Sequence, residues 1–398
     1  MSTPPARVEF YEHQLGQAEA DAARAVLSTL FLTLGPQVAA FEAELGATLL
    51  DGREGERHVV GTSSCSLGLL LAMRALGVGP GDEVITTPMT FASTTNAILL
   101  AGGTPILVDV EPTTGLIDPS CVRAAIGPRT KGILAVHLYG QLADMKALRA
   151  LADAHSLFVV EDSAHGIEMQ RDGVRPGDLG ECAVFSFYAT KNLTSGDGGA
   201  IVTKDRAIAE RLRRLRNHGV SRAATERHGG LYQHWDLVEL GYKANLTDLD
   251  AALLRPQLPL VEEKRDRRQS LVERYERELE EHVFAPHGES SGAVPWTIAR
   301  TGKSSHHLFT IHTPTKLRDA ILTELGKANI GTAVNYRAIH LLTYLVERLA
   351  LPRGSFPVAE EIGDRTISLP LYPQLDHGRQ DRVIAAVRAA WEKARAEP

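Results

Sequence analysis

The sequence predicts an α/β protein in which a mostly parallel central sheet lies between layers of helices. From about residue 58 to residue 204, short apolar and β-branched runs recur, and each is followed by Gly, Pro, Asp or Ser. Stretches of helical periodicity, such as 67–76 and 145–155, separate several of these runs. Strands that alternate with helices in this way build parallel sheets that are covered on both faces.

Seven of the apolar runs are candidate strands, each bounded by turn-forming residues. They are residues 58–61, 83–87, 105–110, 132–137, 157–161, 183–187 and 199–203. We expect antiparallel exceptions near Gly199. Because the ligands of such sheets bind at the carboxyl ends of the strands, the polar residues that follow these runs are the first candidates for a functional site.

The composition changes after Lys204, where charged helical stretches and a second alternation of elements begin. The candidate elements of this part are helices at 205–217, 256–281, 316–328 and 380–396 and a strand at 307–312. The charge run 262–268 is typical of a solvated helix face. We expect a large domain at 1–255, including an N-terminal helical segment, and a smaller C-terminal α+β domain at 256–398.

Composition and charge exclude several classes of protein. The 398 residues allow a sizeable core, and the three Cys are too few and too scattered for a disulfide framework or a structural zinc site. A formal net charge of −6 argues against nucleic acid or an anionic membrane as the main partner. The amino terminus lacks a signal-peptide pattern, and no apolar run approaches the ~20 residues that cross a bilayer. We expect a cytoplasmic protein without a bound metal.

A carboxylate follows the buried run that ends at Glu161. Asp162 stands there, within the sequence Glu-Asp-Ser-Ala-His that ends at His165. A carboxylate at the end of a parallel strand faces the ligand crevice, where it needs a cationic or hydrogen-bonding partner because unpaired burial is costly. On the residues alone, two other interpretations stay open: Asp162 or Ser163 caps a helix, or Asp162 and His165 bind a metal.

A lysine follows the next candidate strand. Lys191 stands five residues after Ser186, and the glycine-rich loop 195–199 comes shortly afterwards. Two interpretations are open for this lysine. It lies in a surface turn, or it lies beside a buried carboxylate and its amine forms a Schiff base. Partial desolvation and nearby cations lower the pKa of lysine and make the free amine available.

Small polar residues join the first candidate strand to the helix that starts near Leu67. Ser64, Cys65 and Ser66 offer backbone N–H groups at the N-terminus of this helix, which suits the binding of a phosphate. The nucleotide-binding fingerprints GxGxxG and GxxxxGK[ST] are both missing. Cys65 has no recognisable histidine partner that would make it a nucleophile.

Phe91 follows the strand at 83–87 and either covers the core or stacks on a flat ring. With the phosphate cradle, Asp162 and Lys191, it completes the set of groups that pyridoxal phosphate requires. The cradle holds the phosphate, Phe91 stacks on the pyridine ring, and Asp162 keeps the ring nitrogen protonated. Lys191 forms the Schiff base and then serves as general acid–base.

On these residues the sequence resembles the DegT/DnrJ/StrS group of fold-type-I pyridoxal-phosphate aminotransferases, which act on keto sugars and related rings. The similarity runs almost from end to end. It is carried by blocks such as ALGVGPGDEVITTPMTFAST, VVEDSAHG, FSFYATKNLTSGDGGAIVTKD and GYKANLTDLDAALL. The resemblance implies that Lys191 binds the cofactor covalently, that Ser186 contacts the phosphate and that Asp162 pairs with the ring nitrogen.

The sequence departs from the usual family pattern at three places. His165 stands where most members have a Gln that contacts the ring oxygen of the cofactor. The phosphate turn 64–66 is Ser-Cys-Ser where Ser-Gly-Thr is common. The block that often reads GxNxR supplies a phosphate contact from the neighbouring subunit, and here either Lys243 or Asn245 would take that role.

The resemblance implies a homodimer with active sites at the subunit interface. It also implies the transfer of an amino group from L-glutamate or L-glutamine to a keto sugar, and the variant block 241–245 favours a nucleotide-linked 4-keto-6-deoxyhexose. Candidate substrate contacts are Tyr188, His218, Tyr336 and His340.

Other functions stay open beside this one. A cyclitol aminotransferase or an aminobenzoate-type ring synthase shares the EDSAH motif. A dehydratase that uses pyridoxamine phosphate typically carries His in place of the lysine, so Lys191 argues against it. A non-catalytic regulator that binds the cofactor needs a reader domain, for which the chain shows no additional length.

Overall fold

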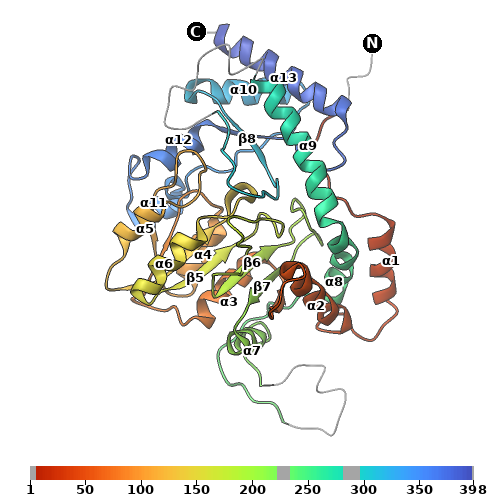
Figure 1. Cartoon of the computed structure of the whole chain (residues 1–398), viewed down its shortest axis with the longest axis vertical. Helices are drawn as coiled ribbons and strands as arrows, with labels where there is room; N and C mark the ends of the chain where they lie inside the picture. The colour runs from red at the N-terminus through yellow and green to blue at the C-terminus, as the bar shows by residue number, and fades with distance from the viewer. Residues whose placement is uncertain (1–5, 222–233, 281–295, 397–398) are drawn as a thin grey trace.

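The computed structural model describes residues 6–221, 234–280 and 296–396. Figure 1 shows a central sheet with helices around it and a second group of elements, from the end of the chain, above it. Helix α9 (Val261–Leu279) runs along one side of the molecule from this upper group down toward α8. Within the described residues, no helix combines the length and the apolar composition that crossing a membrane requires.

Within the described residues, the central sheet has seven strands in the order β1-β7-β6-β5-β4-β2-β3. In that order they are His58–Thr62, Gly199–Thr203, Cys182–Ser186, Phe158–Asp162, Thr130–Val136, Glu83–Thr86 and Thr104–Leu107. Strand β7 runs antiparallel to both of its neighbours, and the other neighbouring pairs are parallel. The predicted α/β class, the mostly parallel sheet and the antiparallel exception near Gly199 are confirmed.

Alternate side chains of the inner strands enter separate hydrophobic cores on the two faces of the sheet. Val160 of β5 packs against one layer of helices, and its neighbour Val159 packs against the other. The first layer is formed by α3 (Cys65–Ala75), α4 (Ala92–Leu100) and α7 (Arg206–Leu215). The second is formed by α5 (Pro119–Ala125) and α6 (Met145–His155), with α2 (Pro36–Leu50) and α8 (Asp248–Leu254) beside them. Burial on both faces explains the uninterrupted apolar run of β5.

The C-terminal elements surround a core of their own. The antiparallel pair β8 (Phe309–His312) and β9 (Thr366–Leu369) packs with α9 and with helices from the end of the chain. These are α10 (Thr315–Lys327) and α13 (His377–Ala396). Helices α11 (Thr343–Leu349) and α12 (Pro357–Arg365) pack instead near the carboxyl ends of β3 and β4. Val8 joins the C-terminal core and pairs with Ile330. The division at residue 255 stays a prediction.

Three predicted elements differ from the observed ones. The long helix expected at 256–281 begins as a 3₁₀ helix (Arg255–Leu260), because the proline within it lacks the N–H that an α-helix needs. The strand expected at 105–110 ends at Leu107, since Val110 pairs instead with Ile117. The C-terminal strand begins two residues after His307, which lines a cavity.

The charge run 262–268 is also not uniformly solvated. Helix α9 exposes Glu262, Glu263 and Asp266, the other residues of the run are at least half-buried, and the side chain of Arg268 is buried. Its partner is Glu168, in an ion pair that lies inside the molecule.

Strand β7 packs closely against the turn that precedes α3. A Cβ atom on Gly199 would lie 2.6 Å from the backbone nitrogen of Cys65 and 2.6 Å from the carbonyl carbon of Ser64. Backbone atoms cannot rotate away as a flexible side chain can, so glycine is required here by space.

We expect Gly199→Ala to lower the free energy of unfolding by about 1–3 kcal/mol, because strand and turn must move apart. The measurement is urea denaturation followed by circular dichroism. Gly79→Ala is the matched control, since a Cβ there meets no atom within 4 Å. Equal stability of the Gly199→Ala protein and the wild type would contradict the close packing.

Candidate active site

A cavity of about 650 Å³ opens at the carboxyl ends of β4, β5 and β6. Residues predicted from the sequence that line it are Ser64, Cys65, Ser66, Phe91, Asp162, His165, Ser186, Tyr188, Lys191 and Tyr336. The structure therefore brings together most of the candidates, which the sequence places as far apart as positions 64 and 336.

The N-terminus of α3 forms one wall of the cavity. Ser64 caps this helix, and its Oγ accepts a hydrogen bond from the N–H of Leu67 (3.2 Å). The remaining N–H groups of the first turn and the helix dipole favour an anion at this wall. Burial raises the pKa of the Cys65 thiol well above its usual range, so Cys65 stays protonated and is unsuited to act as a nucleophile.

Asp162 is the last residue of β5, and it is 5 % exposed. Its Oδ2 accepts a hydrogen bond from the Thr94 hydroxyl (2.8 Å), and its Oδ1 accepts one from the N–H of Ala164 (3.2 Å). Burial raises the pKa of Asp162, whereas these two hydrogen bonds and the nearby Lys191 oppose the rise. Among the described residues, no cation forms an ion pair with this carboxylate. A ligand with a cationic N–H group would supply the missing charge.

Lys191 lies in the turn that follows β6, where its N–H donates to the carbonyl of Tyr188 (2.8 Å). Its Nζ lies 3.4 Å from Nε2 of His307. Burial lowers the pKa of the Lys191 amine from 10.5 to about 8. A substantial share of the amine is therefore neutral near physiological pH, as a nucleophilic lysine requires.

His165 is held in one protonation state by its neighbours. Its Nδ1 accepts a hydrogen bond from the N–H of Tyr139 (3.0 Å), which places the ring proton on Nε2. Nε2 lies 3.1 Å from the hydroxyl of Tyr336. Burial lowers the pKa of His165 well below its usual range. The neutral ring thus presents an N–H donor, as the amide of the Gln that the family resemblance leads one to expect here would do.

Aromatic side chains mark the mouth of the cavity. Phe91, directly before α4, is 61 % exposed, and its ring centre lies 6.1 Å from that of Tyr336. Tyr188 is also exposed. Exposed aromatic rings beside a cavity offer flat surfaces on which a ligand ring can stack.

Three of the predicted residues lie together outside the cavity wall. Lys243 pairs with Asn217 through a backbone bridge, and the N–H of His218 donates to the carbonyl of Tyr242 (2.8 Å). In the orientation that satisfies its amide, Asn245 donates to the carbonyl of Arg216 (2.8 Å) and accepts from Nζ of Lys243 (2.7 Å). Lys243 is exposed, so it is free to contact another molecule.

His340 does not reach the cavity either. Its side chain is fully buried, packs edge-on against Phe356 and lies with Nε2 3.0 Å from Oε1 of Glu360. Such contacts hold a 3₁₀ turn (Ile339–Leu341) against α12. The expected contact of His340 with the substrate therefore has no support from the described residues.

Sequence reasoning missed several residues of the site. Thr94 hydrogen-bonds Asp162, and His307 contacts Lys191. Further unpredicted lining residues are Phe10, Tyr11, Thr90, Asp197, Asn335, Leu369 and Leu371. Most come from the two ends of the chain and carry no motif. The one available signal was the pair of histidines that precedes the strand beginning at Phe309.

The donor set fits pyridoxal phosphate. The helix N-terminus suits its phosphate, the unpaired carboxylate of Asp162 suits a protonated ring nitrogen, and Lys191 offers an amine of lowered pKa to its aldehyde. Across the three described stretches, no group of three or more His, Cys, Asp or Glu side chains is arranged to hold a metal ion.

This sheet topology, with a lysine and a carboxylate at the ends of adjacent strands, defines a pyridoxal-phosphate-dependent aminotransferase of fold type I. The chain belongs to the DegT/DnrJ/EryC1/StrS aminotransferase family, whose model matches residues 13–388. The predicted family and reaction class are confirmed.

Individual relatives agree over nearly the whole chain. The spore coat polysaccharide biosynthesis protein SpsC of Bacillus subtilis (strain 168) is 37 % identical over 382 residues, 94 % of each chain. The structure of S. venezuelae DesV in complex with a ketimine intermediate has a TM-score of 0.83 and 36 % identity, and covers 98 % of this chain and 99 % of its own. NtdA of Bacillus subtilis, with bound cofactor PMP, has a TM-score of 0.83 and 28 % identity, and covers 98 % of this chain and 86 % of its own. These relatives confirm pyridoxal phosphate as the cofactor.

The lowered pKa of Lys191 makes a prediction about pH. In cofactor-free protein, acetylation of Lys191 by trace acetic anhydride should rise with pH and be half-maximal near pH 8, because only the neutral amine reacts. Quantitative mass spectrometry of the labelled peptide measures this. A lysine in a model peptide, with a pKa of about 10.4, is the reference. A midpoint for Lys191 at that of the reference would contradict its burial.

Proposed function

We propose that this enzyme transfers an amino group from L-glutamate or L-glutamine to a nucleotide-linked keto sugar, specifically a 4-keto-6-deoxyhexose. The observation that carries the reaction type is Lys191 with its lowered pKa in one cavity with the buried Asp162. The sugar substrate is supported by the relatives, since SpsC is named for polysaccharide biosynthesis. The exposed rings of Phe91 and Tyr188 give the mouth of the cavity a surface suited to a flat or cyclic ligand.

Different residues of the cavity are assigned to different parts of the cofactor. We assign the phosphate to the first turn of α3 and to Ser186, whose hydroxyl lies in the cavity wall. Asp162 would accept a hydrogen bond from the protonated ring nitrogen, and the N–H of His165 would donate one to the ring oxygen. Bound pyridoxal phosphate supplies an aldehyde that takes up the amino group and a ring that draws electrons from the reacting carbon.

Lys191 has two tasks in this proposal. Its amine would first hold the cofactor, and it would be released when the amino donor takes its place. The freed Nζ, neutral because of its lowered pKa, would take the proton from the α-carbon of the donor, carry it as an ammonium, and give it back to the carbon of the bound cofactor that receives the amino group. The same Nζ serves in the reverse direction when the keto sugar enters.

Lys191→Ala should abolish the visible absorbance that borohydride fixes in the loaded protein, because no other amine lines the cavity among the described residues. Wild type mixed with L-glutamate should convert to the pyridoxamine spectrum, and the variant should not. Lys146→Ala, at an exposed position of α6, is the control and should behave like wild type.

A panel of keto sugars and keto cyclitols tests the substrate. Amination of nucleotide-linked 4-keto-6-deoxyhexoses, with glutamate and glutamine compared as donors and products identified by mass spectrometry, supports the proposal. Amination of keto cyclitols alone would overturn the sugar assignment and leave the transaminase assignment standing.

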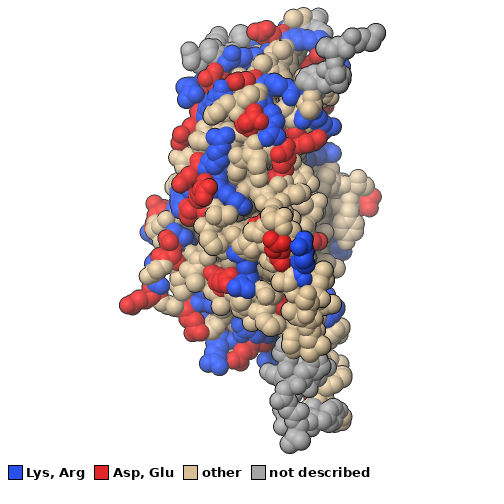
Figure 2. Space-filling view, turned by 90° about the vertical axis from the view of Figure 1, so that its right-hand side faces the viewer, with Lys and Arg blue, Asp and Glu red and all other residues tan. Residues whose placement is uncertain are grey.

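We further propose a homodimer that completes the site. Lys191 is the only Lys or Arg among the described residues that line the cavity, although a phosphate and a donor carboxylate would both enter it. The exposed Lys243, beside Asn245, is a cation that a second subunit can supply. Large apolar side chains are exposed just before this pair: Trp235, Leu237, Val238 and Leu240. Figure 2 shows charged side chains over the upper part and the left side of the face turned 90° from Figure 1, and mostly uncharged side chains on its right, directly above the grey atoms.

Replacing Leu237 and Leu240 with Glu should dissociate the dimer, because charges would be buried at the interface. Light scattering after gel filtration should give twice 43.2 kDa for wild type and 43.2 kDa for the double variant. Lys146→Glu, at an exposed site on α6, is the control. A monomeric wild type with a full complement of bound cofactor would contradict the proposal.

A further inference from the structure

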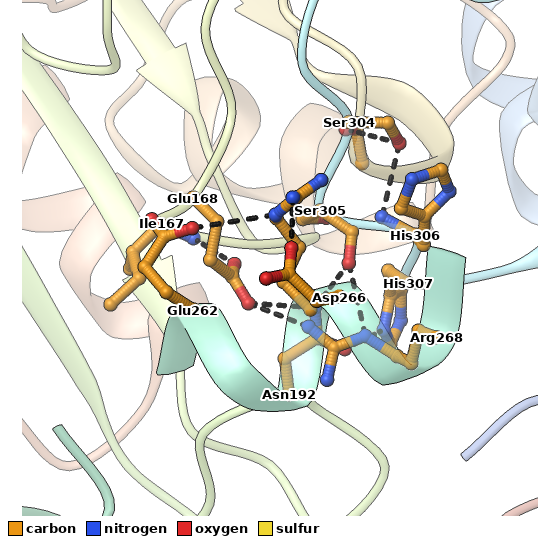
Figure 3. Close-up of polar contacts among 12 residues, drawn as sticks. Ile167, Glu168, Asn192, Glu262, Asp266, Arg268, Ser304, Ser305, His306 and His307 are labelled. Atoms are coloured by element: carbon orange, nitrogen blue, oxygen red, sulfur yellow. Dashed lines mark hydrogen bonds and ion pairs between the residues drawn. The ribbon is translucent and has the colours of Figure 1, made fainter. Parts of the chain in front are cut away.

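A series of polar side chains leads from Arg268 on α9 to His307 (Figure 3), and His307 in turn contacts Lys191. It begins with Arg268, whose side chain is 2 % exposed, and Glu168, whose side chain is 1 % exposed. Nη2 of Arg268 donates to Oε1 of Glu168 (2.7 Å). Nε of Arg268 donates to the carbonyl of Ser305 (3.0 Å). Removing two charges from water is costly, and the proposed reaction uses neither of them directly.

The ion pair determines which way the amide of Asn192 points. Nδ2 of Asn192 donates to the carbonyl of Ser305 (3.1 Å) and lies 3.4 Å from Oε1 of Glu168. Both of these groups only accept hydrogen bonds, so the NH₂ end of the amide must face them. Oδ1 then points to the opposite side, where it lies 3.3 Å from Nδ1 of His307 (Figure 3).

The orientation of the amide in turn determines the tautomer of His307. An amide oxygen cannot donate, so Nδ1 of His307 carries the ring proton. Nε2 is therefore the unprotonated nitrogen, and it lies 3.4 Å from Nζ of Lys191. At this position Nε2 can only accept, and an N–H of Lys191 is the donor.

The surroundings keep His307 neutral. The titratable groups that face it are Lys191 from the turn after β6, His165 from the loop after β5, with ring centres 4.5 Å apart, and Arg268 from α9. None of these is an anion, and Asn192 separates the ring from Glu168. Burial, and after it the positive charges that Lys191, His165 and Arg268 can carry, lower the pKa of His307 well below its usual range.

We propose that Asn192, oriented by the buried Glu168–Arg268 ion pair, holds His307 in the tautomer whose Nε2 accepts a hydrogen bond from Nζ of Lys191, so that His307 is a positioning residue for the reactive amine. A lysine amine otherwise rotates freely at the end of a flexible four-carbon chain. One hydrogen bond to the wall restricts it to the part of the cavity beside Asp162. The importance for turnover rests on the proposed function, whereas the hydrogen bonds themselves do not.

The tautomer is tested first, in the cofactor-free full chain. Long-range ¹H–¹⁵N correlation spectra with labelled histidine distinguish the two tautomers, and the signals of His307 are those missing from His307→Gln. Protonation of His307 at Nδ1 in wild type and in Asn192→Asp, whose carboxylate also only accepts, supports the proposal. Protonation of wild-type His307 at Nε2 overturns it.

The effect on Lys191 is tested by the pH dependence of its acetylation in the same cofactor-free protein. A hydrogen bond to the charged amine favours the charged form. His307→Phe and Asn192→Leu should therefore lower the midpoint by about one pH unit, the size expected when one hydrogen bond to a charged group is lost. His307→Gln, whose amide oxygen can accept from Nζ, and Asn192→Asp should not lower it. An unchanged midpoint in both His307→Phe and Asn192→Leu, with circular dichroism like that of wild type, overturns the proposal.

Turnover provides a third measurement. His307→Phe should reduce kcat at least tenfold with less than a twofold change in the KM of the amino donor, because His307 acts on the amine and not on the donor. His307→Gln should recover most of the loss. A change in KM alone would overturn the positioning role. If wild type shows no transamination, the proposed function fails. The spectra and the labelling still test the tautomer of His307 and its hydrogen bond to Lys191.

Discussion

The burial of a carboxylate that has no cationic partner in the described part of the chain is the constraint on which the rest of the site depends. Asp162 ends an inner strand, where both faces of the sheet are covered and water is largely excluded. A charge in such a place is tolerated only when hydrogen bonds and a counter-charge surround it. Thr94 and the backbone of Ala164 supply the hydrogen bonds. In the proposed site the counter-charge comes from the ligand.

The same constraint explains the placement of Lys191. Parallel strands deliver their carboxyl ends to one edge, and the order β5-β6 therefore puts the residues after Asp162 and after Ser186 side by side. Desolvation at this edge raises the pKa of the acid and lowers that of the amine. Opposite shifts in adjacent groups are a consequence of one dry environment, which disfavours the charged form of both groups.

The sheet and the strand-end residues could be predicted because their signals are local. Apolar runs bounded by glycine and proline mark the strands, and Asp162 and Lys191 follow such runs directly. His307 and Asn335 could not be predicted, because they reach the cavity through contacts made over more than 100 residues of sequence. Arg268 is a residue for which the local sequence predicts the wrong environment. Its charged neighbours indicate an exposed helix, and only the tertiary position of Glu168 reveals why one member of the run is buried.

The short segment before the first helix contributes to both the C-terminal core and the wall of the cavity. Val8 bonds to the chain on both sides of Ile330, through the carbonyl of Asn329 (2.9 Å) and the N–H of Gly331 (2.8 Å), and Phe10 and Tyr11 continue from it into the cavity wall. Trimming the chain to the start of α1 at Gln17, a common step when crystals are sought, would remove an edge of the C-terminal core and part of the active-site wall together. A shortened protein of this kind would report on an altered site, so the full amino-terminal segment belongs in every kinetic and binding experiment.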